Sequence, residues 1–80
     1  MKFTEREMKL AKFFIEREGE GILDVIREID LFEEGIIDSL DLVTLAVHIE
    51  KEFNNKIDLT DSGVFDSMRR FDSLCKVAGV

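Results

Sequence analysis

Apolar side chains recur at helical spacing near the start of the chain, and this spacing predicts an amphipathic helix over about residues 4 to 17. Thr4 is expected to be its N-cap, because Glu7 stands three residues later and completes a capping box. Gly19 and Gly21 interrupt the apolar pattern, so the helix should end before them.

The next segment, from Gly21 to Gly35, carries too many apolar residues for a free loop and is too short for another long helix. We expect a loop that lies on the core and contains one helical turn. Its apolar residues are Ile22, Leu23, Val25, Ile26, Ile29, Leu31 and Phe32.

A second long helix is expected over residues 39 to 53, with Asp38 as its N-cap, Asp41 at the capping-box position and Asn54 at its end. At about 100° per residue, one arc of this helix forms an ordinary core face. That face consists of Leu42, Leu45, Ala46, Ile49 and Phe53.

The same helix carries a second apolar group, formed by Leu40, Val43 and Val47. The two groups together cover well over half of the circumference, whereas packing on a core needs a stripe of roughly 100°. We therefore expect part of this surface to be covered by short helices or left open for a partner.

Two short helices are expected in the last third of the chain. Asp61 or Ser62 can start the first, and Asp72 is expected to cap the second, which continues through Cys75 and Val77. The expected fold is an all-α, small four-helix bundle with two long and two short helices.

The length and composition agree with one soluble domain spanning residues 1–80. A chain of 80 residues can bury only a single core, and 45% hydrophobic residues with seven Phe suffice to fill it. We expect all seven Phe to be core residues. This hydrophobic content, together with 36% charged residues, indicates a folded soluble chain, and no apolar run approaches the roughly 20 residues of a membrane span.

The net charge of −7, from 18 acidic and 11 basic residues, repels nucleic acid and anionic membranes and attracts basic protein surfaces. We expect a monomer whose partners are proteins. The single Cys75 forms no internal disulfide, and the charged N-terminus is unlike a signal peptide, so a cytoplasmic location is expected.

The chain contains four Asp-Ser pairs, and each can be explained as a helix or turn start. Ser39 differs from the other serines because it begins the helix with the broad apolar surface, after Gly35 and within an acidic cluster. In the first turn, free backbone amides and the helix dipole favour an anion such as a phosphate. The pairs are Asp38-Ser39, Asp61-Ser62, Asp66-Ser67 and Asp72-Ser73.

The segment LFEEGIIDSLDLVTLAVHIEKEF, residues 31 to 53, resembles the acyl carrier proteins. Their mark is an Asp-Ser-Leu or Asp-Ser-Met at the start of the second helix, here Asp38-Ser39-Leu40. The resemblance implies that Ser39 receives a covalent 4′-phosphopantetheine arm from coenzyme A. LFEEGIIDS and the later FDSLCKV are most similar to the D-alanyl carrier branch.

The resemblance also implies that the protein is not an enzyme. A phosphopantetheinyl transferase modifies it, a loading ligase or acyl-transferring enzyme attaches an acyl or aminoacyl group as a thioester, and partner enzymes receive that cargo. Asp38, Asp41 and Glu50 are expected to supply charge for partner recognition, with Leu40 and Val47 as an apolar centre. The sequence does not identify the cargo.

Two other functions remain as alternatives. The first is an unmodified carrier-like subunit that only binds other proteins. The second is an EF-hand-like calcium site over residues 30 to 41, with Asp30 at position 1 and Asp41 at position 12. Phe32 stands at position 3, which must supply an oxygen, so we expect no dedicated metal site.

Hydrolytic chemistry is not expected. The chain has no Gly-x-Ser-x-Gly elbow, and its only histidine, His48, is expected to be an ordinary solvated side chain on the second long helix. Cys75 lies among apolar neighbours and is expected to be a small buried residue rather than a reactive thiol.

Overall fold

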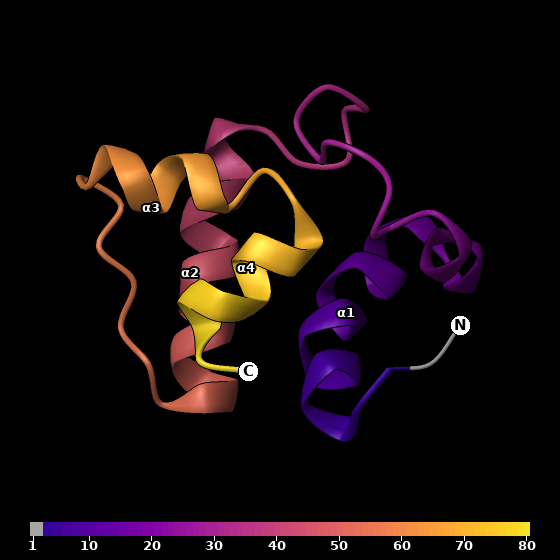
Figure 1. Cartoon of the computed structure of the whole chain (residues 1–80), viewed down its shortest axis with the longest axis horizontal. Coiled ribbons are helices and arrows are strands. Elements are labelled where there is room, and N and C mark those ends of the chain that lie inside the picture. Colours follow the sequence, from indigo (N-terminus) through magenta and orange to yellow (C-terminus); the bar gives the residue numbers. More distant parts are fainter. Residues whose placement is uncertain (1–2) are drawn as a thin grey trace.

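A computed structural model describes residues 3–80, and over that range the protein is a bundle of four α-helices with one 3-10 turn (Figure 1). Two helices are long and two are short, which confirms the expected all-α four-helix bundle. The elements are α1 (Glu5–Glu18), η1 (Glu20–Asp24), α2 (Ser39–Phe53), α3 (Ser62–Ser67) and α4 (Phe71–Ala78). Within the described range, none of these helices has the length and apolar character needed to cross a bilayer.

The start of α1 follows from its capping box. The Thr4 hydroxyl accepts a hydrogen bond from the Glu7 amide at 3.0 Å, and the Glu7 carboxylate accepts one from the Thr4 amide at 2.9 Å. The helix ends one residue beyond the expected range, where Gly19 adopts a φ of 87° that other residues rarely adopt. The capping residues were therefore predicted correctly from the sequence.

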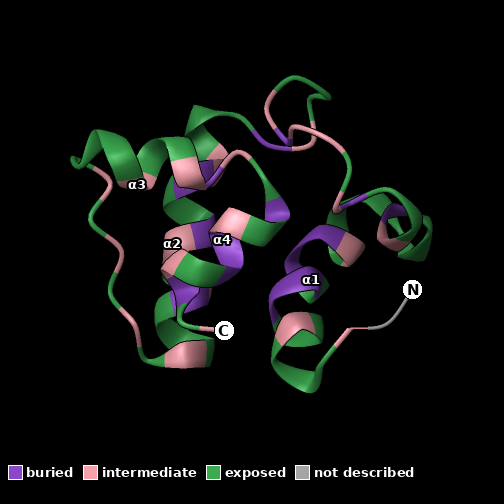
Figure 2. Cartoon of the chain, in the orientation of Figure 1, coloured by how far each residue is buried: buried purple, intermediate pink, exposed green. Residues whose placement is uncertain are grey.

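The core lies where the buried sides of α1, α2 and α4 face one another (Figure 2). Phe71 at the start of α4 is fully buried, and its ring makes edge contacts with Phe14 at 6.4 Å and Phe3 at 5.9 Å between centroids. The helix α2 contributes Leu42, Leu45 and Ile49 to this core, all from the face expected to be buried.

The segment between η1 and α2 lies on this core, as expected. Ile26, Leu31 and Ile37 are at most 1% exposed. The Leu31 carbonyl accepts hydrogen bonds from the amides of Ile36 and Ile37, and the Leu31 amide donates to the carbonyl of Arg69 at 2.6 Å. The chain that leads into α2 is therefore fixed by both apolar burial and backbone hydrogen bonds.

The short helix α3 has no buried residue and appears entirely exposed or intermediate in Figure 2. Its Phe65 is 38% exposed and stacks on Phe32, with 5.5 Å between the ring centroids. The expectation that every Phe is a core residue is therefore wrong for Phe65, whose ring covers Phe32 at the surface.

Asp72 does not cap the last helix as expected, whereas Asp66 starts a turn, because its carbonyl accepts a hydrogen bond from the Arg69 amide at 3.3 Å. Arg70, not Asp72, is the N-cap of α4, and it makes no side-chain cap hydrogen bond. Asp66-Ser67 lies at the end of α3, where the Ser67 hydroxyl donates to the carbonyl of Gly63 at 2.9 Å.

The Asp72 carboxylate is instead paired with Arg27, which comes from the loop after η1. The same guanidinium pairs with Glu7 of α1 at 3.0 Å and lies over the Phe3 and Phe71 rings, 4.6 Å and 5.3 Å from their centroids. Arg27 therefore joins α1, the loop and α4. This tertiary pairing explains why Asp72 does not cap its own helix.

Candidate functional site

The first turn of α2 is closed by the expected capping box. One carboxylate oxygen of Asp38 accepts hydrogen bonds from the amides of Leu40 and Asp41, both at 3.0 Å. Asp41 returns the interaction, because its Oδ2 accepts from the Asp38 amide at 3.0 Å. The hydrogen bond from the Asp41 amide is the largest cause that lowers the pKa of the Asp38 carboxyl. The Leu40 amide and the charge of Arg17 lower it further, against the opposing effect of desolvation. The expectation of free amides in this turn is therefore wrong for Leu40 and Asp41.

Ser39 is the first residue of α2, and its side chain is exposed. Among residues 3–80 its hydroxyl forms no hydrogen bond, whereas the Ser67 and Ser73 hydroxyls donate to backbone carbonyls. Ser62 is exposed as well, but it begins the six-residue helix α3, which has no buried side chain. Ser39 alone combines an exposed, unbonded hydroxyl with a helix that is anchored in the core.

The second apolar group of α2 is open to solvent. Leu40 is 79% exposed, Val43 57% and Val47 50%, and we call these three residues the α2 stripe. Exposed aliphatic side chains gathered on one helix face are typical of a protein-binding surface. The sequence allowed this surface to be either covered by the short helices or open for a partner, and the structure shows it largely uncovered. Glu50 is also exposed on α2.

His48 is not the solvated side chain expected from the sequence. It is half-buried, its Nε2 lies 3.0 Å from the Lys9 carbonyl oxygen, and its ring centroid is 5.6 Å from that of Phe13. The side chain therefore helps α2 pack against α1. It offers no base beside Ser39.

Asp30 organises the turn that precedes the Asp-Ser-Leu motif. Its Oδ1 accepts hydrogen bonds from the amides of Phe32 and Glu33 at 2.9 Å and 3.1 Å, and its Oδ2 accepts one from Arg69 Nε at 3.0 Å. The hydrogen bond from Glu33, with smaller contributions from Phe32 and Arg69, lowers the pKa of the Asp30 carboxyl.

Asp41 has a similar environment at the other end of the motif. Its Oδ1 is 2.7 Å from Arg17 Nη2, and its side chain is only 18% exposed. The carboxylates at positions 1 and 12 of the calcium loop considered above are thus paired with arginines. Across residues 3–80, no group of three or more His, Cys, Asp or Glu side chains is placed to hold a metal ion.

Cys75 lies in the core, as expected, with 7% of its surface exposed. Burial, together with smaller charge effects, raises the pKa of its thiol from the ordinary value of 9.0 to about 11. A buried thiol that stays protonated near neutral pH is a poor nucleophile, so Cys75 is a packing residue.

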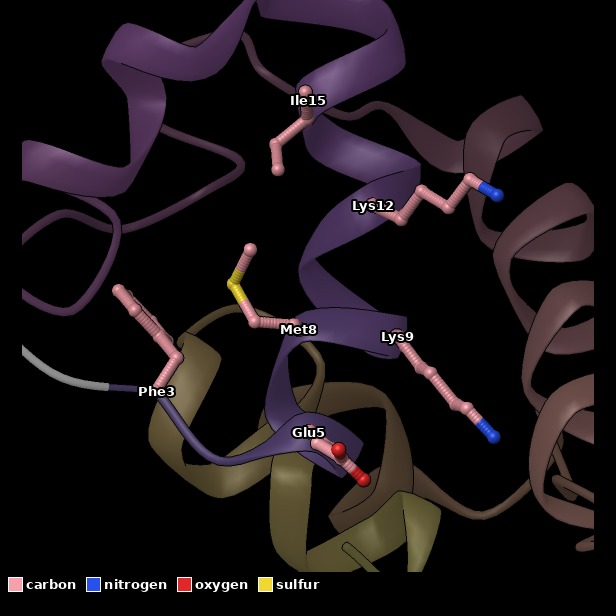
Figure 3. Close-up of a pocket in the computed structure, with 6 residues that line it drawn as sticks. All are labelled: Phe3, Glu5, Met8, Lys9, Lys12 and Ile15. Atoms are coloured by element: carbon pink, nitrogen blue, oxygen red, sulfur yellow. The ribbon is translucent and has the colours of Figure 1, made fainter.

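A groove along α1 is lined by Phe3, Glu5, Met8, Lys9, Lys12 and Ile15. Figure 3 shows Phe3, Met8 and Ile15 on one side of the helix and the Lys9 and Lys12 side chains on the other. No serine, cysteine or histidine lines the groove. The groove therefore adds no nucleophile or base to the residues around Ser39.

The fold and this helix start define a small helical domain with one exposed serine at the start of a core-anchored helix. The model of the phosphopantetheine attachment site family matches residues 10–74. The protein therefore belongs to the phosphopantetheine attachment family, whose domains hold covalently bound 4′-phosphopantetheine and carry substrates for other enzymes. Searches of curated proteins and of solved structures returned no match.

Proposed function

We propose that Ser39 is the residue that holds the arm and that the protein carries an acyl or aminoacyl group as a thioester on it. The observation that carries this proposal is the exposed, unbonded Ser39 hydroxyl at the start of a core-anchored helix, within an Asp-Ser-Leu sequence. The similarity of LFEEGIIDS to the D-alanyl carrier branch supports an aminoacyl cargo. Residues 1–80 act as one carrier domain in this proposal.

Attachment requires one substitution at phosphorus. The Ser39 Oγ forms a bond to the phosphorus that bears the pantetheine group of coenzyme A, the pyrophosphate P–O bond breaks, and 3′,5′-ADP leaves. The hydroxyl proton passes to a base of the transferase, because the Ser39 hydroxyl has no hydrogen-bond acceptor among residues 3–80. The terminal thiol of the bound arm supplies the thioester chemistry, and this chain supplies the fixed end of the arm.

Partner enzymes are proposed to bind the face of α2 that surrounds Ser39. Asp38, Asp41 and Glu50 supply negative charge that attracts basic surfaces, and Leu40 and Val47 form the apolar centre. A carrier must bind a transferase, a loading ligase and acyl-transferring enzymes in turn, which suits a small interface. We propose a monomer in the cytoplasm, where the lone thiol of Cys75 stays reduced.

The proposal is tested by incubating the protein with coenzyme A and a phosphopantetheinyl transferase of broad specificity, followed by intact mass measurement. The expected product has gained the mass of one phosphopantetheine, and peptide mapping places it on the peptide that contains Ser39. A second carrier protein in the same tube shows that the transferase is active. Modification of that carrier alone would support the alternative, an unmodified protein-binding subunit.

Replacing Leu40 by serine is expected to raise the KM of the transferase for this carrier about tenfold, because an apolar anchor at the centre of the interface is lost. Leu40 is 79% exposed, so the helix content by circular dichroism should not change. The matched control is Val25→Ser, which removes an apolar side chain that is 43% exposed near η1. Equal KM values for both variants and the wild type would contradict the proposed docking role.

A further inference from the structure

The segment from Asp30 to Asp41 contains Ser39, and both of its ends have the same construction. At each end one carboxylate oxygen accepts backbone amide hydrogen bonds from within the segment. The other oxygen of the same carboxylate pairs with an arginine from outside the segment. We call residues 30–41 the attachment segment.

The two arginines come from elements that lie far from the attachment segment in the sequence. Arg17 is in the last turn of α1, and Arg69 lies between α3 and α4. Each guanidinium also lies over an aromatic ring, with Arg17 5.5 Å from the Phe13 centroid and Arg69 5.8 Å from that of Phe32. A guanidinium held by a ring and a carboxylate has little freedom, so each arginine fixes one end of the segment.

These pairs are poorly explained as stabilising contacts alone. The side chains of Arg17 and Arg69 are 37% and 39% exposed, and ion pairs in contact with water add little to the free energy of folding. The segment is already attached to the core through Leu31 and Ile37. We infer that the two ion pairs orient the backbone at the two ends of the attachment segment, before and after Ser39.

Ser39 itself has no contact that would orient its hydroxyl, because it is exposed and unbonded among residues 3–80. Its direction depends on the backbone of Asp38 and on the first turn of α2. Asp41 fixes that turn through the Asp38 amide, and Arg17 in turn holds the Asp41 carboxylate. The route from Arg17 to the reacting oxygen is therefore short, since each residue along it contacts the next.

We propose that Arg17 and Arg69 are positioning residues that orient Ser39 for transfer of the arm. The proposal rests on the proposed function of Ser39. Neither arginine needs to contact coenzyme A or the transferase. Both act through the carboxylates of Asp30 and Asp41, which hold the attachment segment in one conformation before the enzyme binds.

Arg17→Gln and Arg69→Gln are each expected to lower the kcat of the transferase about tenfold, because small errors in the position of a nucleophile reduce the rate of transfer strongly. Loss of a positive charge is expected to favour binding, since a more negative carrier attracts a basic enzyme better, and the KM of the transferase for the carrier should fall. Lys12→Gln is the matched control, with the same charge change on the exposed side of α1. It should retain the wild-type kcat.

Two further measurements distinguish positioning from a general loss of structure. Amide hydrogen exchange should speed up at Leu40 and Asp41 in Arg17→Gln, while amides in α4 stay protected. The double variant Arg17→Gln with Asp41→Asn should have the kcat of Asp41→Asn alone, because the two residues act as one unit. Arg17→Lys and Arg69→Lys, which keep the charge, should recover part of the lost kcat.

A wild-type kcat in both glutamine variants would overturn the proposal, and so would an equal fall in Lys12→Gln. If a glutamine variant does not fold, Asp41→Asn or Asp30→Asn decides in its place, because it weakens the same ion pair, and a wild-type kcat there also counts against the proposal. Failure of the proposed function is a different result, since the wild-type protein would then not be modified at Ser39 at all.

Discussion

Ser39→Ala protein is expected to keep its unmodified mass after incubation with coenzyme A and the transferase, whereas the wild type gains one phosphopantetheine. The reason is chemical, because alanine has no oxygen to bond to phosphorus. Helix content and thermal midpoint should change little, since the Ser39 hydroxyl makes no hydrogen bond in the described chain and Asp38 supplies the cap. Intact mass spectrometry and circular dichroism are the measurements.

Ser62→Ala is the matched control for this substitution. Ser62 is also exposed, also follows an aspartate that caps a helix, and has the same free hydroxyl among residues 3–80. Its variant should be modified to the same extent as the wild type. Modification of Ser39→Ala together with loss of modification in Ser62→Ala would assign the arm to α3 and refute the proposed site.

Phe71→Ala is expected to destabilise the protein by about 3–5 kcal/mol, because it removes a fully buried ring and leaves a cavity. For 80 residues the whole free energy of unfolding is about 4–12 kcal/mol, so the variant loses a large share of its stability and should unfold at a clearly lower urea concentration than the wild type. The ring contacts Phe3 and Phe14 of the N-terminal part and lies under Arg27, so its loss weakens α1 and α4 together. Urea denaturation followed by circular dichroism measures the effect.

Phe65→Ala provides the comparison for the same chemical change at the surface. Phe65 is 38% exposed and loses mainly its stack on Phe32, so the cost should be about 1 kcal/mol. Similar denaturation midpoints for the two variants would contradict a larger contribution of the Phe71 ring to stability.

Local sequence was sufficient where one side chain determines the backbone around it. Thr4 and Asp38 accept hydrogen bonds from amides two or three residues away, and Asn54 ends α2 in the left-handed conformation. The bounds of α2 were therefore predicted to the residue. The sequence also indicated the exposed α2 stripe, because the apolar arc of this helix is broader than one contact with the core can cover.

Pairs between distant residues could not be predicted in the same way. Asp72 has the local sequence of an N-cap, but Arg27 binds its carboxylate from 45 residues away. Asp30 and Asp41 occur at calcium-loop positions, yet Arg69 and Arg17 are their partners. Such choices depend on which elements meet in the folded state, and a single sequence does not contain that information in its spacing.

The sequence predicted the candidate attachment residue, but not the contacts between helices that hold α2 in place. The Asp-Ser-Leu motif pointed to Ser39, and the structure shows the side chain exposed at the start of α2. His48 was misassigned because a helical wheel shows only one helix. Its contact with the Lys9 carbonyl depends on where α1 lies, which the wheel does not represent.

The Asp38 carboxylate occupies the amides of Leu40 and Asp41, and this has a mechanical consequence for a group attached at Ser39. Those two donors are not available to grip a phosphate, and the negative charges of Asp38 and Asp41 repel one. The carrier therefore does not bind the phosphate at the attachment point. An arm attached there can rotate about its bonds to Ser39 and reach the active sites of several enzymes, while α2 itself stays in place.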